Sequence, residues 1–398
     1  MNLLSTQISQ IISTVNKTWL QKAWLRVWQT RGIIACLLWP CSILFGWLVA
    51  LRRQAFLRGY LRSWRAPVPL IIIGNINVGG SGKTPTVIAL AKALHAAGFR
   101  PAVLSRGYGA RLTQPRAVTP ADDAMAVGDE PLLMAKALSS CNIPVWVHPD
   151  RSLCAQQLLA IHANTNVLMS DDGLQHYRFA RKAPRDIEIV VMDTRLLGNR
   201  WLLPAGPLRE PLHRQRDFTL WTGPKPQEQA CDTSTANSVI RGQLPDHNRH
   251  THPEQSKTPH LSTTINHHAV SGQHFFIPFS LGDAWQLNHS SAQRPLSHFS
   301  AVPTGCLLAA AGIGYPEKFF IALRQQGLSF ETLALADHFS FSRNPFINST
   351  AQFILITEKD AVKCAHINDS RIWVVPVQAL LDPILIEQMT QRLKRENG

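Results

Sequence analysis

The sequence predicts an α/β protein whose mostly parallel sheet carries helices on both faces. From Val68 onward, short β-branched runs alternate with segments of helical periodicity, and a glycine-rich turn follows the first run. The 398 residues suffice for two domains, and a hydrophobic content of 45% supports a packed core. We expect a P-loop NTPase-like sheet domain, a smaller C-terminal α/β domain and an N-terminal membrane-associated helical segment.

The first 66 residues are basic and rich in tryptophan. No acidic residue precedes Asp122, and the stretch holds six of the eleven tryptophans. Together with the net charge of +14, this indicates a polyanionic partner. Basic residues mixed with tryptophan and long apolar runs are typical of a membrane interface, whereas an arm that binds nucleic acid is usually more polar. We therefore expect an anionic membrane surface and no nucleic acid.

Two helices are predicted in this N-terminal stretch. Residues 3–28 have the apolar spacing of an amphipathic helix, and residues 33–51 contain no charge. These 19 residues just reach the length that spans a bilayer, with Pro40 near their middle. Arginines on both sides leave the orientation open. A spanning helix, an interfacial helix and a buried core helix remain alternatives.

The rest of the chain divides into a larger and a smaller α/β part. In the larger part, strands are expected at Val68–Ile73, Pro101–Leu104, Pro144–Val147, Asn166–Ser170 and Ile187–Asp193, and helices at Thr86–Ala97, Glu130–Ser139 and Arg151–Ala160. In the smaller part, strands are expected at Leu307–Ala311, Phe353–Thr357 and Ile372–Pro376, and a helix at Pro316–Gln326. The domains expected are the membrane segment 1–66, the sheet domain 67–222, a polar insertion 223–300 and the C-terminal domain 301–398.

The glycine-rich turn has the pattern of a phosphate-binding loop. It lies between a predicted strand and a predicted helix, which is the context that such a loop requires. The nucleotide-binding residues expected are Asn77, Val78, Gly79, Gly80, Ser81, Gly82, Lys83 and Thr84. Lys83 would neutralise phosphate charge, and the Thr84 hydroxyl would hold Mg²⁺. Asn77 stands where the general pattern has glycine.

Further chemistry-bearing residues follow other predicted strands. Asp171 and Asp172 end an apolar strand, where a carboxylate associated with Mg²⁺ belongs, although an Asx turn is the alternative. Asp129 opens a predicted helix, so a capping role competes with a chemical one. Arg106 lies in an exposed glycine-rich loop and could meet phosphate. Asp337-His338 could orient an imidazole, and the 357–363 stretch has the pattern of a capped helix start.

The motifs GNINVGGSGKTP, SRGYG, VGDEP, DDGLQH, GNRWLLPAGPLREP, ADHF and TEKDAVK occur in one order along the chain. With them the sequence resembles the tetraacyldisaccharide 4'-kinase family, the lipid A 4'-kinases of Gram-negative bacteria. The resemblance covers roughly 68–218 and 304–377. Position 77 is commonly not glycine in that family.

The resemblance implies transfer of the γ-phosphate of ATP to the 4'-hydroxyl of a tetraacyldisaccharide 1-phosphate, a lipid A precursor, which gives lipid IVA. It implies that Asp129 accepts the hydroxyl proton, that His338 holds and tunes Asp129, and that Asp171 and Asp172 are associated with Mg²⁺. With Lys83, Asp129 and His338 are thus the catalytic residues expected. ATP and Mg²⁺ are the cofactors expected, and the cytoplasmic face of the inner membrane is the expected location.

We expect the loop of Arg106 and Tyr108 to bind the lipid substrate, and no obligate protein partner is evident. Two other classes of function compete with the kinase. A GTPase or metallochaperone-like switch would use the same phosphate loop, but an NKxD-type base-specificity motif is missing, and TEKD at 357–360 matches it only in part. A membrane scaffold without enzymatic activity would leave the phosphate loop unexplained.

Overall fold

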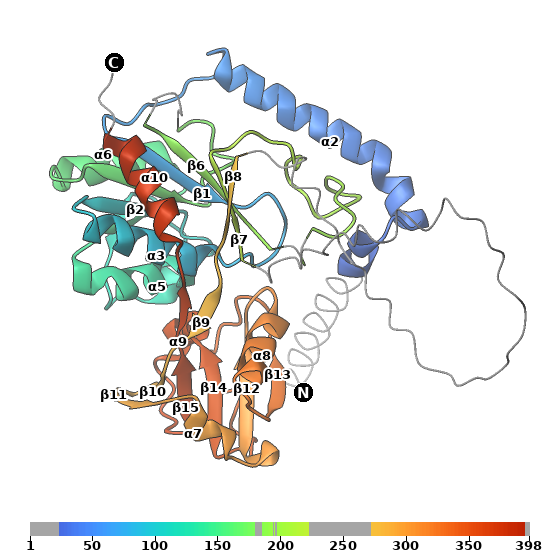
Figure 1. The fold of residues 1–398 in the computed structure, drawn as a ribbon, viewed down its shortest axis with the longest axis vertical. Helices are drawn as coiled ribbons and strands as arrows, with labels where there is room; N and C mark the ends of the chain where they lie inside the picture. The colour runs from blue at the N-terminus through green and yellow to red at the C-terminus, as the bar shows by residue number, and fades with distance from the viewer. Residues whose placement is uncertain (1–23, 180–184, 194, 196, 223–271, 395–398) are drawn as a thin grey trace, which may run out of the picture.

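The computed structural model describes residues 24–179, 185–193, 195, 197–222 and 272–394 (Figure 1). Most of the amphipathic helix expected at 3–28 and most of the polar insertion expected at 223–300 therefore lie outside the described residues. Within the described ranges, two sheets form two lobes that a two-stranded connection joins.

The first lobe is built on an eight-stranded sheet. Its order is β3 (Arg116–Val118), β4 (Val145–Val147), β2 (Pro101–Ser105), β5 (Val167–Asp171), β1 (Leu70–Gly74), β6 (Ile187–Met192), β7 (Phe218–Trp221) and β8 (Gln273–Phe276). Every neighbouring pair is parallel except β3 and β4. The predicted parallel sheet is confirmed, and β1 and β5 lie at its centre.

Helices cover both faces of this sheet because its central strands are apolar on both sides. Ile71 and Ile73 of β1 face one core, and Leu70 and Ile72 face the other. The first core is shared with α3 (Lys83–Ala96), α5 (Asp129–Leu138) and the C-terminal α10 (Pro383–Lys394), and the second with α6 (Arg151–Ile161). Each fully buried isoleucine or leucine contributes about 1.5–3 kcal/mol to folding.

The second lobe holds a six-stranded sheet. Its order is β11 (His289–Arg294), β10 (Ala284–Gln286), β15 (Ile372–Val375), β14 (Phe353–Thr357), β12 (Leu307–Ala311) and β13 (Glu331–Ala334). The last four are parallel, whereas β10 is antiparallel to both of its neighbours. Helices α7 (Ser297–Ser300) and α8 (Pro316–Gln325) contribute to one core of this lobe, and α9 (Glu358–Cys364) to the other.

The chain passes between the lobes at two adjacent strands. Strands β9 (Phe279–Leu281) and β16 (Val377–Ala379) form an antiparallel pair between the two sheets (Figure 1). After β16 the chain returns to the first lobe, where α10 packs with α3. Residues 272–294 of the expected polar insertion thus contribute β8 to the first sheet, β9 to the connection, and β10 and β11 to the second sheet.

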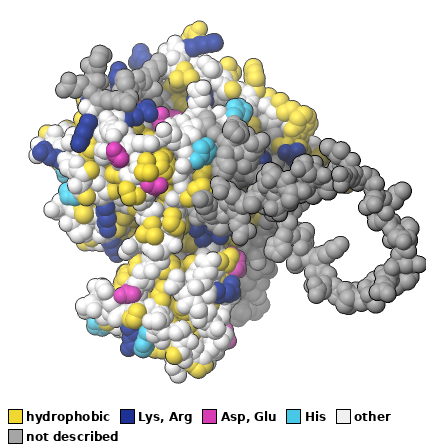
Figure 2. All heavy atoms as spheres, viewed as in Figure 1, with side chains coloured by type: hydrophobic (Ala, Val, Ile, Leu, Met, Phe, Trp, Pro, Cys, Tyr) yellow, Lys and Arg dark blue, Asp and Glu magenta, His cyan; other side chains and the backbone are white. Residues whose placement is uncertain are grey.

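Helix α2 (Ile33–Leu57) lies at the surface of the first lobe, away from the second lobe (Figure 1). It continues through Pro40 and extends beyond the predicted 33–51. By length and composition it is the one helix among the described residues that could cross a membrane. Only Ala35 and Ser42 are buried along it, so the alternative of a core helix is wrong. Figure 2 shows hydrophobic side chains gathered over this helix.

Candidate active site

The candidate site lies at the edge of the first sheet where β1, β2 and β5 end. These three strands are adjacent and parallel, so the loops that follow them emerge on one side of the sheet. The loops are 75–82, 106–115 and the turn after Asp171. They are the three loops in which the sequence predicts functional residues.

The loop predicted to bind phosphate joins β1 to α3, between a strand and a helix as expected. Gly79 and Gly82 have φ values of 116° and 85°, which only glycine adopts without strain. Helix α3 begins at Lys83, directly after the loop, so its free N–H groups point toward the loop. Asn77 is fully buried and its backbone pairs with Leu208, so its side chain supports the loop from inside.

Lys83 is held between two polar side chains at this edge. Its Nζ lies 3.4 Å from Oδ1 of Asn75 and forms an ion pair with Asp172. Asp172 has a left-handed φ of 51°, which turns its side chain out of the strand toward the lysine. Although burial raises the pKa of Asp172, the Lys83 ammonium offsets this and holds the pKa below its usual value.

Asp171 lies directly behind this ion pair. The residue is almost completely buried, and its Oδ2 accepts a hydrogen bond of 3.5 Å from Ser105 at the end of β2. Burial raises its pKa to about 7, although Lys83 acts in the opposite direction. Its Oδ1 has no hydrogen-bond partner among the described residues. The two adjacent carboxylates therefore differ in their surroundings. Asp172 forms an ion pair with a lysine, whereas Asp171 is buried and its Oδ1 accepts no hydrogen bond from the described residues.

Asp129 and His338 meet across the two lobes. The His338 Nδ1 lies 3.0 Å from Oδ2 of Asp129, although the two residues are 209 positions apart. Asp129 is the buried first residue of α5, and Gly128 precedes it with a φ of 95°. His338 itself has a left-handed φ of 57°. The N-cap residue Gly128 has no side chain to cap α5, but Oδ1 of Asp129 accepts a 3.1 Å hydrogen bond from the Glu130 N–H, so the Asp129 side chain also satisfies one N–H at the start of the helix.

The contact shifts the pKa values of both groups in the direction of an ion pair. Burial alone would raise the pKa of Asp129, but the hydrogen bond from His338 and the charge of Lys359 lower it. The hydrogen bond to Asp129 raises the pKa of His338, against a smaller opposing effect of burial. Asp129 is therefore ionised at neutral pH, and its Oδ2 is oriented by the imidazole.

Lys359 belongs to this cluster, although sequence reasoning did not assign it a role. Its Nζ lies 2.9 Å from Oε1 of Glu130 and 3.8 Å from Oδ2 of Asp129. The predicted capped helix start is also confirmed, because Thr357 accepts a hydrogen bond from the Asp360 N–H at the start of α9. The TEKD turn was the available signal, since it combines a strand end with a lysine.

The SRGYG loop places Tyr108 beside the imidazole. The ring centroids of Tyr108 and His338 are 5.4 Å apart, and Tyr108 is 65% exposed. A Cβ on Gly128 would approach Gly107 to 3.2 Å, so the two glycines allow the loops to pack closely. Arg106 is exposed. The predicted substrate-binding residues thus lie on one loop, and its Tyr108 ring lies beside the His338 ring.

A second contact between the lobes lies beside the phosphate loop, and sequence reasoning missed it too. Lys318, in the first turn of α8, places its Nζ 3.3 Å from Oδ2 of Asp193, which follows β6. The same Nζ lies 3.4 Å from Oγ1 of Thr222, whose hydroxyl donates a 2.6 Å hydrogen bond to the Ser81 carbonyl. The second lobe therefore contacts the phosphate loop through a lysine.

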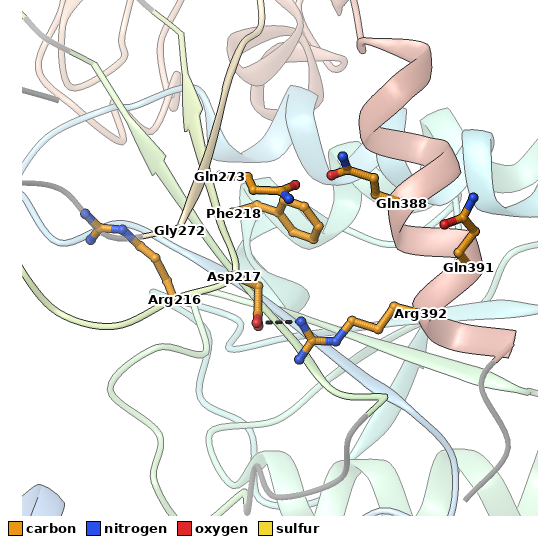
Figure 3. A pocket seen from close by; sticks show the side chains of 8 residues that line it. All are labelled: Arg216, Asp217, Phe218, Gly272, Gln273, Gln388, Gln391 and Arg392. Carbon is orange, nitrogen blue, oxygen red and sulfur yellow. Dashed lines mark hydrogen bonds and ion pairs between the residues drawn. The ribbon is translucent and has the colours of Figure 1, made fainter. Parts of the chain in front are cut away.

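Two of the cavities of the molecule open on the first lobe. One, of about 440 Å³, lies between the beginnings of β7 and β8 and helix α10, and it contains the Asp217–Arg392 ion pair of 2.6 Å (Figure 3). Because β7 is parallel to β1, this cavity lies at the sheet edge opposite the phosphate loop, and no candidate site residue lines it. The other, of about 560 Å³, is bordered by Gly109, Arg111 and Met125, next to the SRGYG loop.

The chain is similar in sequence and in fold to known proteins. A model of the family described as tetraacyldisaccharide-1-P 4'-kinase matches residues 34–394. The tetraacyldisaccharide 4'-kinase of Herminiimonas arsenicoxydans is 45% identical over 388 residues, which cover 96% of this chain and 98% of that protein. The enzyme of the same name from Janthinobacterium sp. (strain Marseille) is 46% identical over 374 residues, which cover 93% and 95%.

The fold is also similar to a solved structure, that of LpxK from Aquifex aeolicus in complex with ATP. The TM-score is 0.64 at 24% sequence identity, and the match covers 91% of this chain and 100% of that chain. This likeness supports the predicted P-loop NTPase-like architecture.

Proposed function

The chain belongs to the tetraacyldisaccharide-1-P 4'-kinase family, and from this premise we propose how its residues carry out phosphoryl transfer. It is an ATP-dependent kinase, and its reaction moves the γ-phosphate of ATP to the 4'-hydroxyl of a tetraacyldisaccharide 1-phosphate, with lipid IVA as product. A GTPase or metallochaperone-like switch is not favoured. The relatives that the chain matches over nearly their whole length are both named as kinases.

The phosphate loop holds the nucleotide. Backbone N–H groups of Gly79–Gly82 and of the first turn of α3 donate hydrogen bonds to phosphate oxygens. The Lys83 ammonium, which already lies at the mouth of the loop, neutralises negative charge on the β- and γ-phosphates. Since Lys83 also pairs with Asp172, the nucleotide and this carboxylate share one cation.

The residues behind Lys83 fit a magnesium ion. Mg²⁺ prefers oxygen ligands, and Asp171, Asp172 and Thr84 supply carboxylate and hydroxyl oxygens at one edge of the sheet. The Asp171 Oδ1, which is buried without a hydrogen-bond partner among the described residues, is an oxygen that such an ion or its bound water would use. When bound, the ion would offset charge on the transferred phosphoryl group.

The Asp129–His338 contact is the observation that carries the assignment of the base. The acceptor hydroxyl oxygen attacks the γ-phosphorus, the bond to the β–γ bridging oxygen breaks, and the hydroxyl proton passes to the Asp129 carboxylate. A pKa below the usual value keeps Asp129 unprotonated before the reaction. His338 donates to Oδ2 and the Glu130 N–H donates to Oδ1, so the carboxylate is held at both oxygens, and the incoming hydroxyl would use a remaining lone pair of the carboxylate.

The acceptor approaches from the side of the SRGYG loop. Tyr108 is exposed next to His338, and Arg106 and Arg111 provide positive charge for an anionic lipid headgroup. Helix α2 exposes Ile33, Leu37, Trp47 and other large apolar side chains, which supports attachment to the cytoplasmic face of an inner membrane. The partner on this proposal is an anionic membrane surface that contains the lipid substrate.

Transfer of radiolabelled γ-phosphate from ATP tests the proposal. Purified protein with Mg²⁺ should label the detergent-dispersed lipid disaccharide, and should label neither simple sugars nor nucleosides. Asp129→Ala should abolish the label while circular dichroism shows an unchanged fold. ATP hydrolysis without transfer to the disaccharide would contradict the kinase assignment, and undiminished transfer by Asp129→Ala would remove Asp129 from the role of base.

A further inference from the structure

One surface segment contacts both α2 and the phosphate loop. We call residues 198–211 the bridging segment; they lie between β6 and β7. Their sequence, GNRWLLPAGPLREP, contains none of the residues to which the reaction assigns a role. The segment nevertheless buries Asn199, Ala205, Leu208 and Glu210, which shows that it is part of the packed first lobe.

At one end, the bridging segment holds α2 by buried hydrogen bonds. The Ser42 hydroxyl, on the buried face of α2, donates to the Leu202 carbonyl at 2.9 Å and accepts from the Ala205 N–H at 3.0 Å. The Trp28 Nε1 donates to the Pro204 carbonyl at 2.9 Å. Each of these bonds ties a backbone group of the segment to one side chain of the membrane-proximal region.

Small residues bring the two backbones close together at this contact. A Cβ on Gly46 of α2 would lie 2.7 Å from Cδ1 of Leu202. Gly198 has a φ of 49°, and a Cβ there would collide with the Trp28 carbonyl. The Asn199 N–H donates to the same Trp28 carbonyl at 2.6 Å. The contact between α2 and the bridging segment is therefore close-packed, and α2 cannot shift along the segment without steric clashes.

At its other end, the bridging segment pairs with the backbone of the phosphate loop. The Val78 N–H donates to the Pro207 carbonyl at 2.9 Å, and the Arg209 N–H donates to the Ile76 carbonyl at 2.6 Å. Two hydrogen bonds in this antiparallel arrangement flank the buried Asn77. Any displacement of residues 207–209 would therefore move the loop that holds the nucleotide.

Internal hydrogen bonds make the bridging segment stiff. The Asn199 side chain donates to the Ala205 carbonyl at 2.8 Å, and the Gly206 N–H donates to the Leu202 carbonyl at 2.9 Å. Leu203 and Leu208 are joined by a further backbone hydrogen bond of 2.8 Å. The distance from Ser42 to Val78 is thus spanned by a closed loop whose polar groups are largely satisfied internally.

We propose that the bridging segment is a strut that fixes the height and tilt of the phosphate loop above the lipid surface on which α2 rests, with Ser42 and Trp28 as positioning residues. The proposal rests on the proposed function, because a fixed height matters only when the acceptor is embedded in a bilayer. A phosphate loop on a loose tether would meet such an acceptor in the correct geometry for only a fraction of the time.

Kinetics with two forms of the acceptor test the strut. The double variant Ser42→Ala, Trp28→Phe removes the hydroxyl and the Nε1–H but keeps the apolar bulk of both side chains. For acceptor embedded in anionic vesicles, kcat/KM should fall about tenfold, as expected for loss of a few modest hydrogen bonds. The KM for ATP, and kcat/KM for acceptor dispersed as monomers in detergent, should each change by less than about twofold.

Two control variants and a binding measurement complete the experiment. The single variant Ser42→Thr keeps the hydroxyl and should retain the activity of the wild type on vesicles. Asn164→Ala changes an exposed residue and should have no effect on the activity with either form of the acceptor. Vesicle sedimentation should be equal for wild type and double variant, so that weaker binding does not explain the loss. Equal losses on vesicles and on dispersed acceptor, or unchanged activity on vesicles, would overturn the strut. Absence of transfer by wild type to dispersed acceptor would instead contradict the proposed function.

Discussion

At the scale of single residues, the chemistry of the site depends on how neighbours set the charge of three carboxylates. Asp129 is kept ionised by His338 and Lys359, and Asp172 by Lys83, whereas burial raises the pKa of Asp171 to about 7. Groups of one chemical type thus acquire different protonation behaviour within one site. The carboxylate next to the imidazole is the one suited to accept a proton.

Lys83→Met should reduce kcat by about 100-fold or more, because it removes a positive charge that the transferred phosphate uses. Loss of the ammonium also removes the partner of Asp172, whose pKa should then rise because only the charges of Arg209 and Arg151 still oppose the effect of burial. Steady-state kinetics with saturating ATP and Mg²⁺ measure the first effect. Lys92→Met, on the same helix α3, is the control, and an active Lys83→Met variant would contradict the assigned role.

Asp129→Asn should lower the pKa of His338. In the native protein the hydrogen bond to the carboxylate raises this pKa above its usual value, and the neutral amide cannot replace that effect. Lys359, which remains nearby, lowers it further. Titration of the histidine ring signals by NMR measures the change, with His338→Gln for assignment. Asp123→Asn removes the same charge from an exposed helix cap and should leave the titration unchanged.

The same shift gives the pair a defined dependence of stability on pH. A histidine whose pKa is raised on folding contributes stability that is complete below its usual pKa, and the contribution disappears as pH rises through the raised value. The difference in free energy of unfolding between wild type and Asp129→Asn should therefore be larger at pH 6 than at pH 9, where the positive charge of His338 no longer contributes. Urea unfolding at both pH values measures it, and a difference that grew with pH would contradict the ion pair.

At the scale of elements, the start of α9 is brought against the start of α5. Lys359 contacts Glu130 and Asp129 and is itself largely buried, so the negatively charged first turn of α5 is matched by a cation from the other lobe. The charges of Glu130, Asp129 and Asp337 raise the lysine pKa although burial opposes them. The two helices therefore fix the relative position of the base and the lobe that carries His338.

Lys359→Met should destabilise the protein by about 1–3 kcal/mol, because two carboxylates lose a largely buried partner. It should also raise the pKa of Asp129, since the Lys359 charge is one of the causes that lower it. The acidic limb of the kcat/KM profile should accordingly shift to higher pH. Lys136→Met, which changes an exposed lysine of α5, is the matched control. An unshifted acidic limb would show that Lys359 does not influence the base.

At the scale of the whole molecule, the proposed nucleotide site lies between two lobes, and among the described residues α2 docks on the first of them. Lys318 and His338 both reach from the second lobe to the first. Lys318 contacts Asp193 beside the phosphate loop, and His338 contacts Asp129, so both parts of the site include a contact between the lobes. Helix α2 docks on the first lobe through the bridging segment. If α2 rests on the membrane as we propose, the lipid surface lies next to the lobe that holds the phosphate loop.

Removal of residues 1–62 should release the protein from anionic vesicles, because the exposed apolar face of α2 is lost with them. The cut should end before Trp64, whose ring packs on Phe179 and whose N–H donates to the Arg178 carbonyl. Sedimentation with vesicles and circular dichroism measure binding and fold. A folded truncated protein that still sedimented would place the membrane contact elsewhere.

The division of the chain into four parts stays a prediction. Two of its expected boundaries are crossed by packing contacts with the first lobe. Trp64 is partly buried and packs against a core of the first lobe although it lies within the expected 1–66 segment. Helix α10 likewise packs in the first lobe although it follows the expected start of the C-terminal domain. Strands β8 to β11 were not expected, because the sequence around them is polar and lacks a clear period of two.

The phosphate loop and its flanking strand and helix were determined by the sequence alone, as were the family and the apolar character of 33–51. These features are local: glycine conformations, hydrophobic periodicity and charge are properties of adjacent residues. Only the tertiary structure decided that Lys359 and Lys318 join the site and that Ser42 docks on the bridging segment, and it supplied the contact between Asp129 and His338, a pairing for which the sequence offered only the family resemblance. Such contacts join residues 125 to 230 positions apart, and the packing of two lobes, which no local pattern encodes, brings them together.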